Sequence, residues 1–185
     1  MTTGFVRLLA LSGALIFVLA VARPVEDAAA APSLAQRTIA QVDKFRTTTW
    51  QLQKLMGRKR TPTLYTERRT SDQDYREWVR DLWKRRAAAA RRQAQNPPHR
   101  GQWMCIHRYE RDPRQGWSTH TGNGYYGGLQ MDITFQRTYG PELLRRKGTA
   151  NNWTPYEQMW VAERAYRSGR GFHPWPNTAR YCGLI

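Results

Sequence analysis

The sequence predicts a mainly α-helical protein that contains at most one small β-hairpin. Apolar residues recur at intervals of three and four in several segments, which is the spacing of amphipathic helices. The alternating pattern of half-buried strands is nearly absent. The turn sequence Gly122-Asn123-Gly124 is the exception, because it suits a hairpin between residues 122 and 131. At 185 residues, with no visible repeat, we expect one domain with additional segments.

The N-terminus has the composition of an export signal. The start MTTGFVR precedes an apolar run from Leu8 to Ala22 that ends in the A-x-A site Ala20–Ala22. The run is too short for a comfortable membrane span. We therefore predict a signal peptide at residues 1–22, with a second candidate cleavage site in the run Ala28–Ala31 and an uncleaved signal anchor as the alternatives. Residues 23–38 are rich in Ala and Pro and predict a flexible linker.

Residues 39–98 are predicted to form a basic helical segment. Apolar residues at roughly helical spacing indicate a first helix over residues 39–56, although the threonines at 47–49 weaken the pattern. A second helix begins after Ser71, a candidate N-cap followed by acidic residues in the first turn. A stripe at helical spacing is typical of a packing face, and its members are Tyr75, Trp78, Val79, Leu82 and Trp83.

The second helix continues into the basic run Lys84–Arg92. Such a run is by default a solvated face, and the alternative is that it binds anionic wall polymers. The sequence Asn96-Pro97-Pro98 ends the helix and marks the boundary of a domain over residues 99–185.

This domain opens with a short amphipathic helix, Trp103–Glu110. Trp103, Ile106, His107 and Glu110 fall on one helical face, so the carboxyl of Glu110 shares a side with apolar groups. A partly desolvated carboxyl is a candidate general acid. The alternative is that Glu110 is the polar last turn of an ordinary helix.

The remaining elements are a helix interrupted at Gly140-Pro141, a well-marked helix, and an extended tail that ends at Cys182. Thr154 and Glu157 form a T-x-x-E capping box with Pro155 at the first helical position, and Gly169 can end that helix.

The two cysteines, Cys105 and Cys182, are an even pair in an exported chain, which predicts one disulfide. The alternative is a metal site formed with His107 and His173, but these spacings match no standard zinc pattern. We predict neither a metal nor a cofactor.

The formal charge of +16 predicts an anionic partner. No nucleic-acid motif is present, and an exported chain meets wall polymers and membrane surfaces instead. A basic protein that acts on membranes through its charge is a further alternative.

Three motifs resemble known enzymes. WMCIHRYE (Trp103–Glu110) resembles the helix of c-type lysozymes that carries the catalytic acid, including a Cys five residues before the Glu. GNGYYGGLQ (Gly122–Gln130) is similar to the substrate-cleft segment of the resuscitation-promoting factors, wall-cleaving enzymes of the lysozyme-like, lytic transglycosylase superfamily. Trp175-Pro176 before Cys182 is similar to the end of that domain. The resemblance covers roughly residues 103–182, under half of the chain.

The resemblance implies a lysozyme-like catalytic domain with Glu110 as its single catalytic acid. In lysozymes a second carboxylate precedes the Tyr-Gly of the next segment, and the matching position here is Tyr125, which cannot serve that role. Asp132 is a substrate-positioning or turn residue. The glycines Gly127 and Gly128 would let a glycan strand approach the backbone. The residues that the resemblance implies as substrate-binding are Trp117, Tyr125, Tyr126, Gln130, Asp132 and Thr134.

This chain departs from the resuscitation-promoting factors after the catalytic Glu, where Ser-Gly-Gly is replaced by RDPRQG (Arg111–Gly116). Arg111 and Arg114 would favour the ionised form of Glu110 if they faced it, and would be free to hold acidic stem peptides if they pointed outward.

The expected function is therefore that of an exported, monomeric enzyme of the bacterial cell wall. It would cleave the β-1,4 bond between MurNAc and GlcNAc in peptidoglycan, as a lytic transglycosylase or a muramidase. The alternative is a non-catalytic peptidoglycan-binding module on the same fold.

Overall fold

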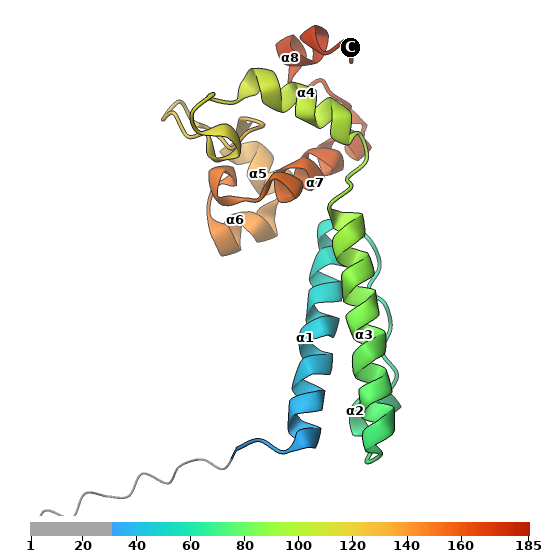
Figure 1. The fold of residues 1–185 in the computed structure, drawn as a ribbon. Coiled ribbons are helices and arrows are strands. Elements are labelled where there is room, and N and C mark those ends of the chain that lie inside the picture. The colour runs from blue at the N-terminus through green and yellow to red at the C-terminus, as the bar shows by residue number, and fades with distance from the viewer. Residues whose placement is uncertain (1–30) are drawn as a thin grey trace, which may run out of the picture. The chain divides into compact units, whose positions relative to one another are not determined.

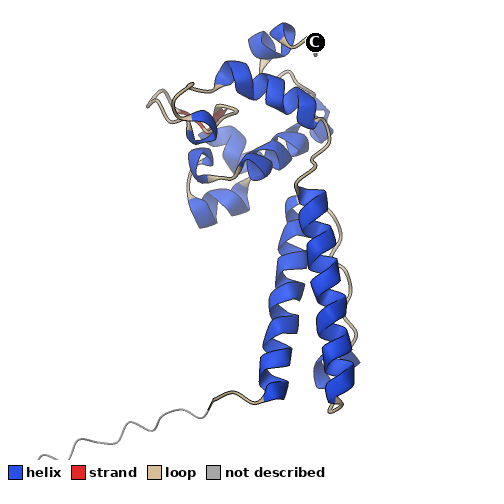
Figure 2. Cartoon of the chain, in the orientation of Figure 1, coloured by secondary structure: helices blue, strands red, loops and turns tan. Residues whose placement is uncertain are grey.

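The computed structural model describes residues 31–185, with the exception of the Arg68 side chain (Figure 1). The predicted signal peptide and residues 23–30 of the predicted linker lie outside the described residues. The predicted fold class is confirmed: helices dominate the described part, which contains one two-stranded antiparallel sheet (Figure 2). No helix among these residues is long and apolar enough to cross a membrane.

Two long helices, α1 (Leu34–Leu55) and α3 (Gln73–Ala94), pack side by side as an antiparallel hairpin, with the short α2 (Thr66–Arg69) between them in sequence (Figure 1). Helix α1 begins earlier than predicted, because Ser33 and Gln36 form a reciprocal capping box. Residues 34–38 are therefore helical and are not a flexible linker.

The threonines of α1 do not interrupt it, because their hydroxyls find acceptors inside the helix. Thr48 donates to the Lys44 carbonyl at 2.9 Å and Thr49 to the Phe45 carbonyl at 2.8 Å. In α3 the N-cap is Asp72 and not Ser71, since the Asp72 carboxylate accepts from the backbone N–H of Asp74 and Tyr75.

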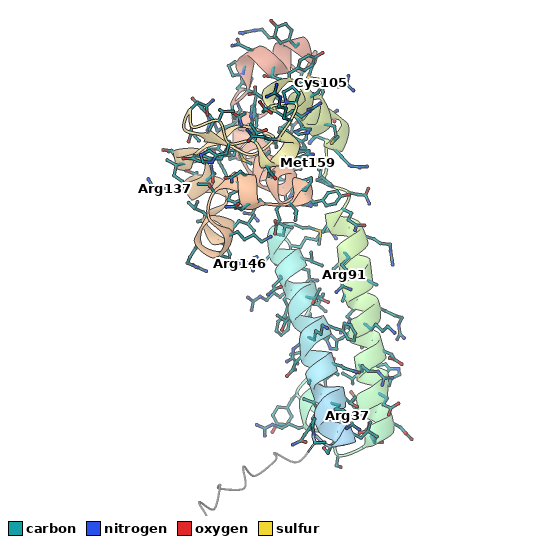
Figure 3. All side chains as sticks on the ribbon, turned by 60° about the vertical axis from the view of Figure 1, so that its left-hand side comes forward. Arg37, Arg91, Cys105, Arg137, Arg146 and Met159 are labelled. Atoms are coloured by element: carbon teal, nitrogen blue, oxygen red, sulfur yellow. A yellow bond between two sulfur atoms is a disulfide. The ribbon has the colours of Figure 1, made fainter. Side chains whose placement is uncertain are left out.

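The hairpin has its own small core around Val42, Val79 and Trp83. The Trp83 indole meets Trp50 edge to face at 5.9 Å and donates to the buried Glu67 carboxylate at 2.9 Å. Trp78, which we expected on the packing face, is instead 52% exposed. Arg37 and Arg91 mark opposite ends of the hairpin in Figure 3.

The rest of the chain forms a second, globular region. Its helices are α4 (Arg100–Glu110), α5 (Ile133–Tyr139), α6 (Pro141–Lys147), α7 (Pro155–Ala165) and α8 (Pro176–Tyr181). Single 3-10 turns lie at η1 (Gly116–Ser118) and η2 (Ala150–Asn152), and a π-helical turn lies at η3 (Tyr166–Arg170).

The local capping signals of this region are confirmed, and its tail differs from the prediction. Thr154 and Glu157 form the capping box of α7, and Gly140-Pro141 separates α5 from α6. Helix α7 gives way to η3, in which Gly169 has a φ of 93°. The tail is not extended throughout, because Pro176 takes the first position of α8.

The sheet consists of β1 (Tyr125–Tyr126) and β2 (Met131–Asp132), paired antiparallel. The turn that joins them is Gly127–Gln130, in which Gly127 and Gln130 have φ values of 77° and 47°. The predicted turn at Gly122-Asn123-Gly124 instead reverses the chain so that His120 forms an isolated bridge with Tyr126.

The core of this region lies between α4, α5 and α7, with contributions from the β1–β2 turn and the residue before α8. Its largest members include Trp103, Ile106, Leu129, Phe135, Met159 and Trp175. Trp160 on α7 faces the other way and donates to the Ala94 carbonyl at the end of α3 at 2.8 Å. Arg164 likewise donates to the Leu55 carbonyl of α1 at 2.9 Å. Polar contacts therefore connect the hairpin to the globular region.

Candidate active site

Glu110 is the last residue of α4 and is partly exposed, while Trp103, Ile106 and His107 on the same helix are buried. The Thr178 hydroxyl of α8 donates a hydrogen bond to Oε1 of Glu110. The structure thus places this carboxylate at the surface, held from one side by a short helix.

Two further contacts join α8 to α4. Cys105 and Cys182 form a disulfide across 77 residues, with Cα atoms 6.0 Å apart. Tyr109 and Tyr181 stack with ring centroids 5.8 Å apart. Because both sulfurs are in the disulfide, they cannot serve as thiolate metal ligands. Among residues 31–185, no group of three or more His, Cys, Asp or Glu side chains is arranged to hold a metal ion.

The two arginines after Glu110 do not pair with it. Arg111 donates to the Pro113 carbonyl at 3.2 Å, and Arg114 is exposed. In the described part of the chain, no ion pair joins either guanidinium to Glu110.

The other acids of residues 99–185 have structural roles. Asp112 accepts from the backbone N–H of Arg114 and Gln115, and Asp132 caps α5 by accepting from the Phe135 N–H at 2.7 Å. Glu142 pairs with Lys54 and Glu157 with Lys147, while the buried Glu163 accepts from Trp103 and contacts His99. Glu110 is therefore the acid of this region that is best placed to act on a ligand.

A groove of about 460 Å³ gathers four of the predicted substrate-binding residues: Tyr125, Gln130, Asp132 and Thr134. Tyr139, Arg170, Pro174 and Trp175 also line it. Glu110 does not line the groove itself. Trp175, which lines the groove, is the N-cap of α8, and Thr178 of that helix contacts Glu110. Helix α8 therefore connects the groove to the carboxylate.

Trp117 and Tyr126, which the resemblance implies as substrate-binding, are not among the residues that line this groove. Both pack against the core. The Trp117 indole stacks on the imidazole of His107, with centroids 3.9 Å apart and an interplanar angle of 10°. The His107 Nδ1–H donates to the Gly128 carbonyl at 3.0 Å. Burial lowers the pKa of His107, and the charge of Arg111 lowers it further, against the opposing effect of the Gly128 hydrogen bond.

The glycines of the β1–β2 turn face protein side chains, in contrast to the expectation that a glycan approaches them. A Cβ atom on Gly127 would lie 2.5 Å from Oε1 of Gln158, and one on Gly128 would lie 2.4 Å from Nδ1 of His107. Gln158 accepts from the Gly128 N–H at 2.8 Å and donates to the Trp117, Ala150 and Trp153 carbonyls. These glycines are therefore required for packing.

Sequence reasoning assigned no role at this site to Thr178, Tyr139 or Arg170. No local pattern marks Thr178 or Tyr139, since each reaches the site through tertiary packing. The glycines on both sides of Arg170 were a usable signal, because Gly169 and Gly171 both have positive φ.

Comparison with known proteins finds relatives of the globular region. The family model of the transglycosylase-like domain matches residues 99–178. Resuscitation-promoting factor RpfE of Mycobacterium tuberculosis is 42% identical over 64 residues, which cover 35% of this chain and 34% of that protein. Resuscitation-promoting factor Rpf1 of Corynebacterium glutamicum is 37% identical over 68 residues, which cover 37% of this chain and 34% of that protein. The chain thus aligns with about a third of the length of these curated relatives. No solved structure matches significantly.

Proposed function

We propose that this protein is an exported enzyme that cleaves the β-1,4 bond between MurNAc and GlcNAc in peptidoglycan, with Glu110 as its catalytic residue. The observation that carries the proposal is the state of the acids in a transglycosylase-like domain. Five are engaged in a turn, a helix cap, ion pairs or the core, and Glu110 alone is bound only by a hydroxyl.

A single acid suits an intramolecular reaction. Glu110 donates its proton to the glycosidic oxygen as the bond from that oxygen to C1 of the muramic sugar breaks. The resulting carboxylate then accepts the proton of a hydroxyl of the same sugar, whose oxygen bonds to C1. The product is an anhydro sugar, and no water is consumed. Hydrolysis would need Glu110 to activate water instead, and glycosidases that hydrolyse usually employ a second carboxylate.

The groove supplies groups suited to a glycan strand. Tyr125 and Trp175 offer aromatic surface, and Gln130 and Thr134 offer hydrogen-bonding groups beside Asp132. The left-handed φ of Gln130 and its side-chain hydrogen bond to the Gly127 carbonyl at 2.8 Å fix its orientation. We infer that these four residues and Asp132 position the strand.

We further propose that the basic hairpin of α1 and α3 binds anionic wall polymers. No acidic residue occurs between Asp81 and Glu110, and Lys84, Arg85, Arg91 and Arg92 are exposed on α3. This charge would keep a monomeric enzyme close to the wall outside the cell, without requiring nucleic acid or a membrane as partner.

Mass spectrometry of purified peptidoglycan tests the proposal. Wild type is expected to release anhydro-muropeptides, and Glu110→Gln is expected to release none. Products with reducing ends would indicate a muramidase. If neither protein releases fragments and the insoluble wall retains both, the chain is a binding module on the same fold.

A further inference from the structure

Arg170 is the only basic residue that lines the groove, all of whose lining residues lie in the described part of the chain. It ends the π-helical turn η3, between Gly169 and Gly171, whose φ values are 93° and 54°. The irregular backbone therefore carries a cationic side chain to an otherwise neutral or acidic groove.

The surroundings hold Arg170 in place without neutralising it. Its carbonyl accepts from the His173 N–H at 3.1 Å, and its side chain lines the groove together with Tyr139. The Tyr139 hydroxyl lies 3.3 Å from the hydroxyl of Ser168. The Ser168 hydrogen bond and, after it, the hydrogen bond and charge of Arg170 lower the pKa of Tyr139 against the effect of burial. No ion pair among residues 31–185 involves Arg170.

The one acid of the groove, Asp132, does not pair with Arg170. Asp132 uses Oδ1 to cap α5 and forms no ion pair within the described residues. The other polar groups of the groove, on Tyr125, Gln130 and Thr134, are neutral. The groove thus combines neutral groups suited to sugar hydroxyls with the Asp132 carboxylate, which caps α5, and one guanidinium, unpaired in the described part of the chain, suited to an anion.

We propose that Arg170, with Tyr139 beside it, forms a subsite for a free carboxylate of the peptide attached to the muramic sugar. The inference rests on the proposed function, since it assumes that the groove holds a glycan strand. A guanidinium presents paired N–H donors that match the two oxygens of a carboxylate. A peptide whose carboxylate is amidated has lost the negative charge. Its NH₂ group is a hydrogen-bond donor and cannot accept from the N–H groups of the guanidinium. The site therefore selects strands with free acids over amidated ones.

Binding can be measured separately from cleavage in the full-length Glu110→Gln protein. Isothermal titration would compare two muropeptides that are identical except that one peptide carboxylate is replaced by a primary amide. We expect the acid to bind about tenfold more tightly, the scale of one charge-assisted hydrogen-bonded pair. Adding Arg170→Gln should remove that preference and leave the affinity for the amide unchanged.

Arg137→Gln is the matched control. Arg137 is exposed on α5 (Figure 3) and lies in sequence between the groove residues Thr134 and Thr138, but it does not line the groove. It should keep the preference for the acid. Equal binding of acid and amide by the parent, or an equal loss in both arginine variants, would overturn the subsite and leave the groove as a glycan site. Failure to bind either ligand would overturn the groove itself, and with it this inference.

Discussion

The Thr178 hydroxyl and the Glu110 carboxylate form a hydrogen bond between residues 68 apart in the sequence. The bond engages Oε1, so Oε2 is the oxygen left to exchange a proton with a ligand. With Glu110 as the proposed catalytic residue, Thr178 is a positioning residue, and the proposed site includes α8 although that helix has only six residues.

Replacing Thr178 by Val should lower kcat by about 10- to 100-fold while KM stays nearly constant, because the acid loses its orientation and the groove is untouched. Thr178→Ser retains the hydroxyl and should stay close to wild type. Rates of soluble muropeptide release at low and saturating substrate separate the two parameters. A Ser variant as slow as the Val variant would show that Thr178 acts only by packing.

Removing the disulfide with the double substitution Cys105→Ser and Cys182→Ser should lower the free energy of unfolding by ~4 kcal/mol on the chain-entropy model. The loop it closes spans 77 residues, which is most of the globular region. Urea unfolding of the variant, and of wild type with and without a reductant, measures the change. Reduced wild type should match the variant, and an unchanged midpoint in both would contradict the expected role.

Lowering the pH should destabilise the protein through His107. Its folded-state pKa lies below the ordinary value of 6.5, chiefly because of burial, so the unfolded chain binds the proton first. The free energy of unfolding should be unaffected by this group above 6.5 and should fall as the pH drops from 6.5 through the folded pKa. An NMR titration of the imidazole checks this directly. A midpoint at or above 6.5 would be inconsistent with it.

Substituting Gly128 by Ala should destabilise the protein by about 1–3 kcal/mol, the usual cost of overpacking. The new methyl group would meet the His107 ring at 2.4 Å. Gly101→Ala is the matched control, because a Cβ there meets nothing within 4 Å and Gly101 lies in α4. Thermal unfolding of both variants decides the matter. Equal melting temperatures would mean that the His107 ring moves aside at little cost.

Features with local causes could be predicted from the sequence. The capping box at Thr154, the break at Gly140-Pro141 and the helix that ends at Glu110 each depend on residues a few positions apart. The start of α1 was missed for a correctable reason. Ser33 and Gln36 are a capping-box pair, and the Ala- and Pro-rich composition around them obscured the signal.

Features that depend on tertiary packing could not be predicted. Tyr139 of α5 and Arg170 of η3 line the same groove because these two elements lie close together in the fold. No spacing in the sequence predicts that they do. Sequence reasoning interprets Gly127 and Gly128 as positions that a glycan strand approaches, whereas they pack against Gln158 and His107, which are 30 and 21 residues distant from Gly128. Sequence patterns identified residues that need close contact without identifying what they contact.

The Cys105–Cys182 bond makes most of the globular region a covalently closed ring. A protease that cuts one peptide bond in the exposed stretch around Gly122–Gly124 would therefore leave both fragments attached to each other. Such a nicked chain would migrate as one species until it is reduced. A cut in the connection after Ala94, outside the ring, would leave no covalent bond between the basic hairpin and the globular region, and contacts such as Trp160–Ala94 and Arg164–Leu55 would be all that holds them together. The first cut would thus leave the globular region covalently in one piece, while the second would separate it covalently from the hairpin, which carries most of the net charge.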